Sequence, residues 1–378
     1  MKKVIFTGYY GMQNYGDDLF SIISTYGAQK YWKDFQPSIL SPEIKGPQAN
    51  FYIPKIISTE AYSAENMFGK IARCAPAIIA AVSKDKMIFS GGSLFSSQQS
   101  GVRNALSLIS KYRNNIFSGI GVSIGPFNSI KAEKKIQDFL KRFEYISVRD
   151  KTSFDIANDF NLECPINLSR DLAGLTNFII PKETHSRESA QTTIGYSPCN
   201  ISGDYEKSTL INNLVINAII MLSQETELNV RVINLNKNKN KNYGDEQLSF
   251  SAQKQLQENG IKTEYVEYTH SGALKTWTEI ASCQAYVSTR LHGAITAYLN
   301  ETPFTLIEYH SKCTDFLDDI GQASKARIKL NEYTAHDYYE TIKALLSNYT
   351  PPTLDPKTYS KESITNFSHA PWASSSTN

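Results

Sequence analysis

The sequence predicts two α/β domains, each built on a parallel sheet. At 378 residues the chain is too long for one ordinary hydrophobic core. Apolar strands are followed again and again by a glycine turn and then a helical pattern, which is typical of βα units. A polar, proline-containing run over 179–191 separates two such series and is the best candidate for a linker.

These observations predict an N-terminal domain over 1–178, a linker over 179–191 and a C-terminal domain over 192–346. The tail, residues 347–378, carries several prolines and ends in a serine-rich run. We expect it either to pack back on the N-terminal domain or to be partly disordered. The oligomeric state is not predicted.

Composition excludes several classes of protein. Thirty-nine basic against 37 acidic residues give a net charge of +2, too weak a field to indicate a nucleic-acid partner. Five scattered cysteines without CxxC spacing predict neither a disulfide framework nor a metal site. The N-terminal apolar run breaks at Gly8, and the stretch Ala75–Val82 is far shorter than the roughly 20 residues that span a membrane. We therefore expect a cytoplasmic protein without a transmembrane segment.

The first strand, KKVIFTGYY, stops at a glycine turn and precedes the helical pattern Leu19–Trp32. Asn14 and Asp17 lie between them, at the carboxyl end of the strand, where open parallel sheets bind ligands. One interpretation is that these residues only cap the helix. The other is that they bind an acceptor molecule.

A second strand, Met87–Phe89, runs into a turn that contains Gly91, Gly92 and Ser93. Glycines there allow the backbone to approach a ligand and expose its amides. Tight turns use the same residues for steric reasons, so the pair alone is a weak indication of a site.

Two Arg-Asp pairs also follow predicted strands. Arg149 precedes Asp150 after YISV, and Arg170 precedes Asp171 after the short strand near INL. Each pair could be an ordinary surface salt bridge. Their position at strand ends favours a role in a ligand site.

The C-terminal half begins with TTIGYSP, a strand that closes on Ser197. A long apolar-periodic helix follows over Leu210–Glu225, and then the strand NVRVINLN. The next run, NKNKNKNYGDEQ over 236–247, is polar and low in complexity, which predicts a solvated loop.

The segment STRLHGAITAYLN carries the most informative chemistry. Residues 285–288 read as a strand and Leu291–Asn300 as a helix, so His292 falls in the first helical turn. Unpaired amides at a helix N-terminus attract anions, and Arg290 adds a fork that matches phosphate or carboxylate. Lys312 follows the next strand and adds a further cation. A histidine near a helix start can also satisfy backbone groups without reacting, and that interpretation stays open.

Taken together, the motifs resemble the polysaccharide pyruvyl transferase family from Val4 to about Gly321. The matching pieces are GYYGMQNYGDD, FSGGSLF, GIGVSIGP, ISVRDK, DLA and STRLHGAITAYLNETPFTLIEYHSK. Three departures occur: Gln13 stands where such proteins commonly carry glycine, Asp18 replaces a usual glutamate, and Ser90 precedes two glycines rather than three.

The resemblance implies a GT-B-like fold, two Rossmann-like domains with parallel sheets facing across a cleft. It also implies phosphoenolpyruvate as donor and a sugar in a polysaccharide, capsule or exopolysaccharide precursor as acceptor, with no cofactor and no metal. Carried over by position, His292 and Arg290 are the expected catalytic residues. Expected donor-binding residues are Arg149 from the facing domain, Arg170, Ser197, Leu291, Gly293 and Lys312, and expected acceptor-binding residues are Asn14, Asp17, Gly91, Gly92 and Ser93.

Two other functions remain open at this point. A GT-B glycosyltransferase would bind a nucleotide sugar at the same helix N-terminus, and fold alone does not separate the two. A non-catalytic carbohydrate-binding protein would carry the same motifs without turnover. A lipid-linked acceptor would favour peripheral association with the inner face of the membrane.

Overall fold

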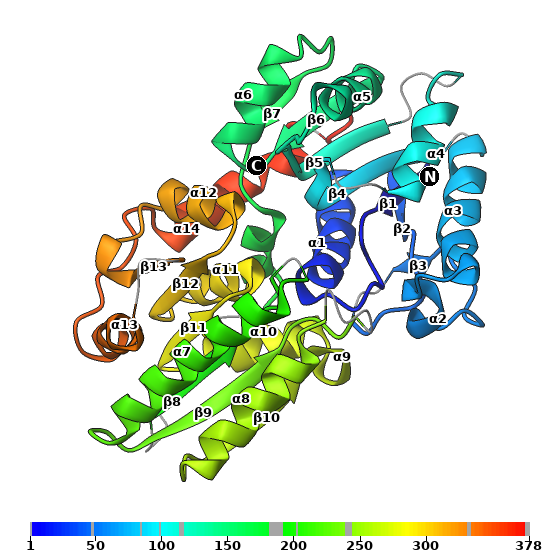
Figure 1. The fold of residues 1–378 in the computed structure, drawn as a ribbon. Coiled ribbons are helices and arrows are strands. Elements are labelled where there is room, and N and C mark those ends of the chain that lie inside the picture. Colours follow the sequence, from blue (N-terminus) through cyan, green and yellow to red (C-terminus); the bar gives the residue numbers. More distant parts are fainter. Residues whose placement is uncertain are drawn as a thin grey trace. The chain divides into compact units, whose positions relative to one another are not determined.

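The computed structural model describes residues 2–46, 49–83, 85–97, 100–112, 117–180, 192–201, 203–238, 244–330 and 334–374. The chain divides into two compact domains, the first formed by residues 1–179 and 359–378 and the second by residues 180–358. Both are α/β domains (Figure 1). Most of the predicted linker, residues 181–191, lies outside the described residues.

Seven strands form the sheet of the first domain: β1 (Lys2–Thr7), β2 (Phe35–Ile39), β3 (Asn50–Phe51), β4 (Lys86–Phe95), β5 (Phe117–Ile124), β6 (Phe143–Val148) and β7 (Ile166–Leu168). Their order is β3-β2-β1-β4-β5-β6-β7, and every pairing is parallel. The order reverses between β1 and β4. In open sheets of this kind, ligands bind beyond the strand ends at such a switch point.

The helices of the first domain are α1 (Tyr15–Tyr31), α2 (Thr59–Ser63), α3 (Met67–Val82), α4 (Gly101–Ile109), α5 (Ile130–Leu140), α6 (Lys151–Asp159) and the 3₁₀ helix η1 (Leu172–Phe178). α1 packs with η1, and α3 packs with α4. Every residue of β5 is buried, as expected for a central parallel strand covered on both faces. A core of phenylalanine rings forms around this strand, with centroids of Phe139 and Phe143 5.0 Å apart.

The second domain has six strands: β8 (Thr192–Ser197), β9 (Leu228–Asn234), β10 (Thr263–Glu267), β11 (Ala285–Ser288), β12 (Phe304–Glu308) and β13 (Arg327–Lys329). They follow the order β10-β9-β8-β11-β12-β13, again all parallel. The switch point lies between β8 and β11. Both domains therefore have Rossmann-like strand orders, and the predicted fold class is confirmed.

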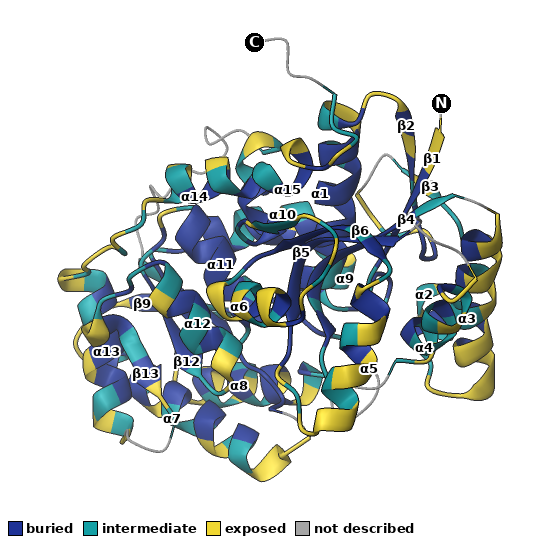
Figure 2. Cartoon of the chain, turned by 90° about the horizontal axis from the view of Figure 1, so that it is seen from above, coloured by how far each residue is buried: buried dark blue, intermediate teal, exposed yellow. Residues whose placement is uncertain are grey.

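The helices of this domain are α7 (Tyr205–Ser223), α8 (Glu246–Glu258), α9 (Tyr268–Ser271), α10 (Ala273–Ala281), α11 (Leu291–Leu299), α12 (Ser311–Asp319), η3 (Ser324–Ala326) and α13 (Ala335–Ser347). Buried side chains of β8, β9, α7 and α13 form one hydrophobic core. Figure 2 shows the inner strands, such as β4 and β5, largely in the dark blue of buried residues. The sheets thus provide the rigid support from which the strand-end loops emerge.

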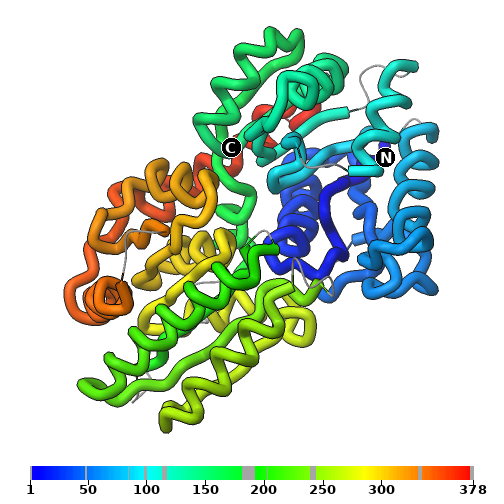
Figure 3. The backbone as a smooth tube through the Cα atoms, in the orientation of Figure 1, coloured from blue at the N-terminus to red at the C-terminus, as the bar shows by residue number. Residues whose placement is uncertain are grey.

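The C-terminal segment belongs to the first domain. After α14 (Pro356–Ser363) comes α15 (Thr365–Ser368), which packs on α1, and Figure 3 shows this red end of the chain back at the first domain. Phe367 is fully buried, and a Cβ at Gly27 would lie only 2.4 Å from its ring. Trp32 Nε1 donates to the Phe367 carbonyl at 2.9 Å. The close approach of α1 to the segment therefore requires glycine at position 27.

Asn366 is the polar centre of this contact. Its Oδ1 accepts from Gly121 N and from Ser147 Oγ, both at 2.8 Å, and its Nδ2 donates to the carbonyls of Arg170 and Ser363, both at 2.9 Å. Asn366→Ala would leave these buried groups without partners, so we expect a loss of about 1–3 kcal/mol in unfolding free energy. Urea denaturation measures it. Asn158→Ala, at an exposed position, is the control, and an equal effect for both would contradict this account.

Candidate functional site

In the second domain, the predicted site residues gather at the switch point, where β8 and β11 end. Arg290 is the N-cap residue of α11, with extended backbone angles (φ −99°, ψ 126°). Ser288 holds this turn: its hydroxyl donates to Arg290 O at 2.6 Å and accepts from Arg290 N at 3.1 Å. The strand end therefore fixes the backbone that carries Arg290.

The Arg290 guanidinium is held by a two-pronged ion pair with Asp245. Nε lies 2.7 Å from Oδ2, and Nη2 lies 2.6 Å from Oδ1. Asp245 is fully buried, whereas Arg290 keeps 18% of its side chain exposed. Burial alone would lower the pKa of Arg290, but the Asp245 carboxylate outweighs it and holds that pKa well above its usual range. The result is a permanent cation with a fixed orientation at the strand ends.

Asp245 corrects the prediction of a solvated loop over 236–247. Asn236 and Asp245 are both buried, and Asp245 N donates to Asn236 O at 2.9 Å. Asp245 Oδ1 also accepts from Asn200 N at 2.8 Å. Residues 239–243 of this run lie outside the described residues. The sequence signal that could have identified Asp245 is its position between a strand end and a helix start, because that position faces the switch point.

The first turn of α11 contains the other predicted residues of this segment. His292 is half-buried, and its carbonyl accepts from Thr296 Oγ1 at 2.7 Å. The Leu291 side chain is buried, so only its backbone is available to a ligand. A Cβ at Gly293 would lie 2.6 Å from Ser288 Oγ, so glycine allows α11 to start directly against β11.

Lys312 lies in the first turn of α12 and belongs to the same group of charges. Its Nζ is 5.8 Å from the centre of the Tyr309 ring. Burial raises the pKa of the Cys199 thiol to about 11, and the charges of Arg290 and Lys312 both oppose this rise. The positive charges of Arg290 and Lys312 therefore both act on the Cys199 thiol.

Ser197 contributes differently from what its position suggests. Its hydroxyl is fully buried, donates to Ile233 O at 2.9 Å and bonds the Tyr286 hydroxyl. The side chain therefore ties β8 to β9 and β11. The Ser197 carbonyl accepts from Thr289 N at 2.9 Å, so this residue supports the strand end from within and exposes neither its hydroxyl nor its backbone.

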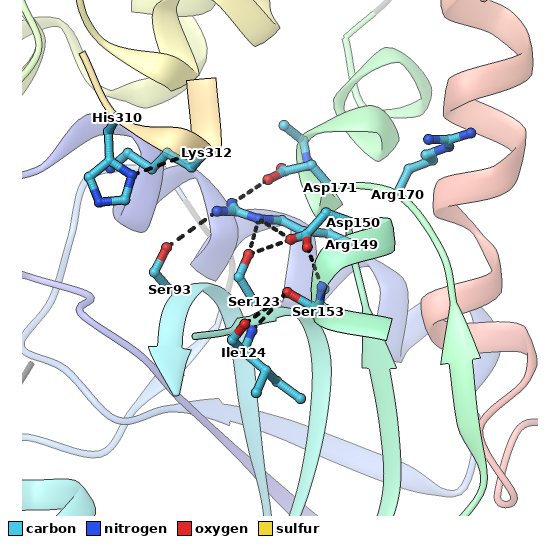
Figure 4. Close-up of polar contacts among 12 residues, drawn as sticks. Ser93, Ser123, Ile124, Arg149, Asp150, Ser153, Arg170, Asp171, His310 and Lys312 are labelled. Atoms are coloured by element: carbon cyan, nitrogen blue, oxygen red, sulfur yellow. Dashed lines mark hydrogen bonds and ion pairs between the residues drawn. The ribbon is translucent and has the colours of Figure 1, made fainter. Parts of the chain in front are cut away.

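In the first domain, Arg149 is the centre of a polar cluster beyond the strand ends (Figure 4). Its Nε donates to Ser123 Oγ at 2.7 Å, its Nη1 to Asp171 Oδ2 at 2.7 Å and its Nη2 to Ser93 Oγ at 3.4 Å. Arg149 is 7% and Asp171 2% exposed. Burial would lower the pKa of Arg149, yet Asp171 and Asp150 raise it. The cluster therefore links β4, β5 and the segment after β7 around one charged guanidinium.

Both carboxylates in this cluster also cap helices. Asp150 Oδ1 accepts from Ser153 N at 2.7 Å at the start of α6, and Asp171 Oδ1 accepts from Ala173 N at 2.9 Å at the start of η1. The C-terminal segment supports Asp171 directly, since Tyr359 OH accepts from its backbone N at 3.2 Å. This contact between the C-terminal segment and Asp171 was not predicted from the sequence.

Arg170 is not part of the Arg149 cluster. Its Nε forms an ion pair with Glu362 Oε2 at 2.6 Å, and Figure 4 shows its side chain pointing away from Arg149. The ring of Tyr359 lies 5.7 Å from its guanidinium carbon. Arg170 therefore fastens the C-terminal segment, which is the salt-bridge interpretation of its Arg-Asp pair.

The predicted acceptor residues lie at the switch point of the first domain. Asn14 caps α1, accepting from Gly16 N at 3.1 Å, so its capping role is confirmed. Asp17 Oδ1 lies 3.4 Å from where a Cβ on Gly92 would stand, which brings the two predicted groups together. Gln13 has a φ of +61°, the left-handed region that favours glycine. This explains in physical terms why glycine suits that position.

Gly91 and Gly92 allow a direct test of the turn in β4. Both have left-handed φ, +71° and +77°, but a Cβ would clash only at Gly91, 2.3 Å from the Phe20 ring. Gly92→Ala should cost about 1–2 kcal/mol of backbone strain. Gly91→Ala should cost about 1–3 kcal/mol more, because it also overpacks the core. Urea denaturation compares them, and equal destabilisation would contradict the close packing of Phe20.

The described residues lack two kinds of feature. None of their helices is both long and apolar enough to cross a membrane. Within the same residues, there is no group of three histidine, cysteine, aspartate or glutamate side chains that could hold a metal ion.

The fold and the site define a class of protein: a two-domain, GT-B-like α/β protein with fixed cations at a helix N-terminus beyond a parallel sheet. The sequence model of one family, polysaccharide pyruvyl transferase, matches residues 14–311. The chain belongs to this family, whose members are transferases. The resemblance read from the sequence motifs is thereby confirmed.

Solved structures with a similar fold have little sequence in common with this chain. The S. aureus MnaA-UDP co-structure has a TM-score of 0.61 at 10% identity, covering 96% of this chain and 94% of that one. UDP-GlcNAc 2-epimerase from Methanocaldococcus jannaschii has a TM-score of 0.57 at 11% identity, covering 96% and 98%. A UDP-forming trehalose-phosphate synthase from Burkholderia xenovorans has a TM-score of 0.51 at 9% identity, covering 98% and 96%. These similarities establish the fold alone, and a search of curated proteins found no match.

Proposed function

We propose that this protein transfers pyruvate from phosphoenolpyruvate to two hydroxyls of a sugar, forming a pyruvate ketal and releasing phosphate. One observation carries the proposal: Arg290, oriented by Asp245, lies at the N-terminus of α11, and His292 follows two residues later in the same turn. A guanidinium matches phosphate and carboxylate, the two anionic groups of phosphoenolpyruvate. Membership of the pyruvyl transferase family supports the reaction class.

The second domain would bind the donor. Arg290 would bind its phosphate or carboxylate, Lys312 would add a second positive charge, and the backbone amide of Leu291 would face the anion at the helix start. The Gly293 amide already donates to Arg290 O at 3.1 Å, so Gly293 would contribute by allowing close packing. The ion pair with Asp245 matters here because a guanidinium already fixed in place loses little freedom on binding. These fixed cations can stabilise a departing phosphate without a metal ion.

His292 would serve as the general acid. The methylene carbon of phosphoenolpyruvate gains one proton and becomes a methyl group, and the first sugar hydroxyl bonds to the central carbon. The bond from that carbon to the phosphate oxygen then breaks, and the second hydroxyl takes its place. Of the two hydroxyl protons, one balances the proton gained by carbon and the other leaves with phosphate. A histidine can supply and regain such a proton near neutral pH.

The first domain would bind the acceptor. Asp17, the Gly91–Gly92 turn and Ser93 lie together, and an aspartate, backbone amides and a hydroxyl suit sugar hydroxyls. Arg149 is almost fully buried and already bonded to Ser93. We therefore assign it a positioning role, in place of the direct donor contact that its sequence position suggested.

A cytoplasmic location forms part of the proposal. All five cysteines are free thiols, which suits a reducing compartment. The acceptor sugar would then receive its pyruvate while it is still a precursor of a capsule or exopolysaccharide, before export.

The test is phosphate release from phosphoenolpyruvate, measured with acceptors that contain galactose, glucose or N-acetylhexosamine. We expect release only in the presence of a matching acceptor. Tight binding of a uridine nucleotide with no turnover of phosphoenolpyruvate would contradict the proposal and favour a nucleotide-sugar glycosyltransferase.

A further inference from the structure

The helix α3 has its small residues inside and its large apolar residues outside. Gly69, Ala72, Ala77, Ala80 and Ala81 are buried. The outward side chains are between 38 and 72% exposed, and their spacings of three, four and seven residues place them in one stripe. They are Met67, Phe68, Ile71, Ile78, Ile79 and Val82. Because a surface helix normally buries its apolar stripe, this arrangement indicates an outer face that is covered by something other than water.

The neighbouring helix α4 and the residues after it also carry exposed apolar side chains. α3 packs with α4, and a Cβ at Gly101 would lie 3.4 Å from Cys74 Sγ. Leu108 and the adjoining Tyr112 are 60% and 88% exposed. Figure 2 shows α3 with a largely exposed outer side. We call the stripe of α3, together with Leu108 and Tyr112, the α3–α4 face.

The charged side chains on the two helices of the α3–α4 face are basic, and exposed Glu65 lies just before α3. Neither segment, 67–83 or 100–112, contains an aspartate or glutamate, and both carry exposed lysines, Lys70 and Lys111. Arg142, from the end of α5, donates to Ser110 O at 3.2 Å beside Lys111. An apolar stripe with cations at its border fits a surface that is apolar below and anionic above.

The same bias holds for the whole domain. Residues 1–179 and 359–378 contain 22 lysines and arginines against 16 aspartates and glutamates, a net charge of +6. Residues 180–358 contain 17 against 21, a net charge of −4. The exposed apolar helix thus belongs to the positive domain, although the chain as a whole is nearly neutral.

We propose that the α3–α4 face docks on an anionic lipid bilayer, with the stripe lying in the interface and the lysines among the lipid headgroups. α3 has 16 residues and a length of about 24 Å, enough to lie along the surface as an interfacial helix. A second copy of the chain is the less suitable occupant, because two such faces would bring like charges together.

The docking face connects to the proposed function through β4. α3 leads into this strand and α4 follows it, and β4 carries the Gly91–Gly92 turn of the proposed acceptor site. Docking would hold that turn near a lipid-linked sugar. This consequence rests on the proposed function, whereas docking itself does not.

Vesicle co-sedimentation of the full chain tests the proposal. The vesicles contain either phosphatidylcholine alone or equal parts of phosphatidylcholine and phosphatidylglycerol. We expect binding to the anionic vesicles, reduced at least tenfold in the double variant Phe68→Ser/Ile79→Ser. The matched control, Ile130→Ser/Leu168→Ser, removes two exposed apolar side chains elsewhere in the first domain and should bind like the unchanged protein.

Circular dichroism of each variant shows whether its fold is retained. The variant Lys70→Glu/Lys111→Glu is a second probe, because it reverses the two lysine charges and leaves the apolar stripe intact. No binding to anionic vesicles, or equal binding by both serine double variants, would overturn the proposal. The proposal would also be overturned if the protein did not bind vesicles but formed a dimer in solution that the Phe68→Ser/Ile79→Ser substitutions dissociated. The assay contains no substrate, so vesicle binding without pyruvyl transfer would sink only the proposed function.

Discussion

Replacing His292 by glutamine is expected to lower the rate of acceptor-dependent phosphate release by about 10²- to 10⁴-fold, the usual contribution of a general acid. Glutamine keeps the size and polarity of the side chain but does not deliver a proton. His292 is half-buried in the first turn of α11, beside the Arg290 cation. The loss should therefore fall on kcat, with the apparent affinity for phosphoenolpyruvate changed much less.

The control for this variant is His336→Gln. His336 lies on α13 and is 68% exposed, near Glu340. Its replacement should leave the rate unchanged. Thermal unfolding of both variants separates lost chemistry from lost fold. A His292→Gln protein that retains full activity would remove the general acid from the proposed mechanism and favour a purely structural histidine.

Asp245→Ala should strongly destabilise the second domain. It leaves the guanidinium of Arg290 largely buried without its counter-charge and Asn200 N without its acceptor. Removing one partner of a buried ion pair typically costs about 3–5 kcal/mol. Because Arg290 is 18% exposed, we expect a value near the lower end of that range. Hydrogen exchange in the core strands β8 and β9 measures the stability of this domain separately.

The same change should weaken donor binding, because Arg290 loses the carboxylate that orients it. Glu258→Ala is the matched control: Glu258 pairs with Lys254 on the exposed side of α8, 3.8 Å apart, and its loss should cost less than about 1 kcal/mol. Adding Arg290→Met to Asp245→Ala should restore part of the stability and none of the activity. Equal effects of Asp245→Ala and Glu258→Ala would show that the ion pair does not hold the site.

Local sequence signals predicted the strand-to-helix junction around Arg290 closely. The strand 285–288 and the start of the next helix at Leu291 agree with the structure, so Arg290 and His292 were correctly placed at a helix N-terminus. Strand, turn and helix are set by residues near one another in the chain. The resulting strand order then follows from repeated βα units.

Asp245 escaped prediction because its role depends on a neighbour in space. It ends a polar run that looks solvated, yet it follows β9, which lies next to β8 at the switch point. The contact with Arg290 joins positions 45 residues apart. Only the order of strands in the sheet brings them together.

The two Arg-Asp pairs show a similar limit. Arg149 follows β6, an inner strand, and its side chain turns into the cluster, whereas Arg170 follows β7 at the edge of the sheet and meets Glu362 instead. The dipeptides alone are identical. Likewise, periodicity shows which residues of α3 share a face, but not that its alanines pack inward.

The most direct test of the central claim is the reaction of the full chain with phosphoenolpyruvate and a sugar acceptor in D₂O, followed by NMR of the product. Proton transfer to the methylene carbon predicts a ketal whose methyl group contains one deuterium, formed in step with phosphate. A product lacking the ketal, or a ketal whose methyl group contains no deuterium, would contradict the assignment of pyruvyl transfer to the Arg290 and His292 site.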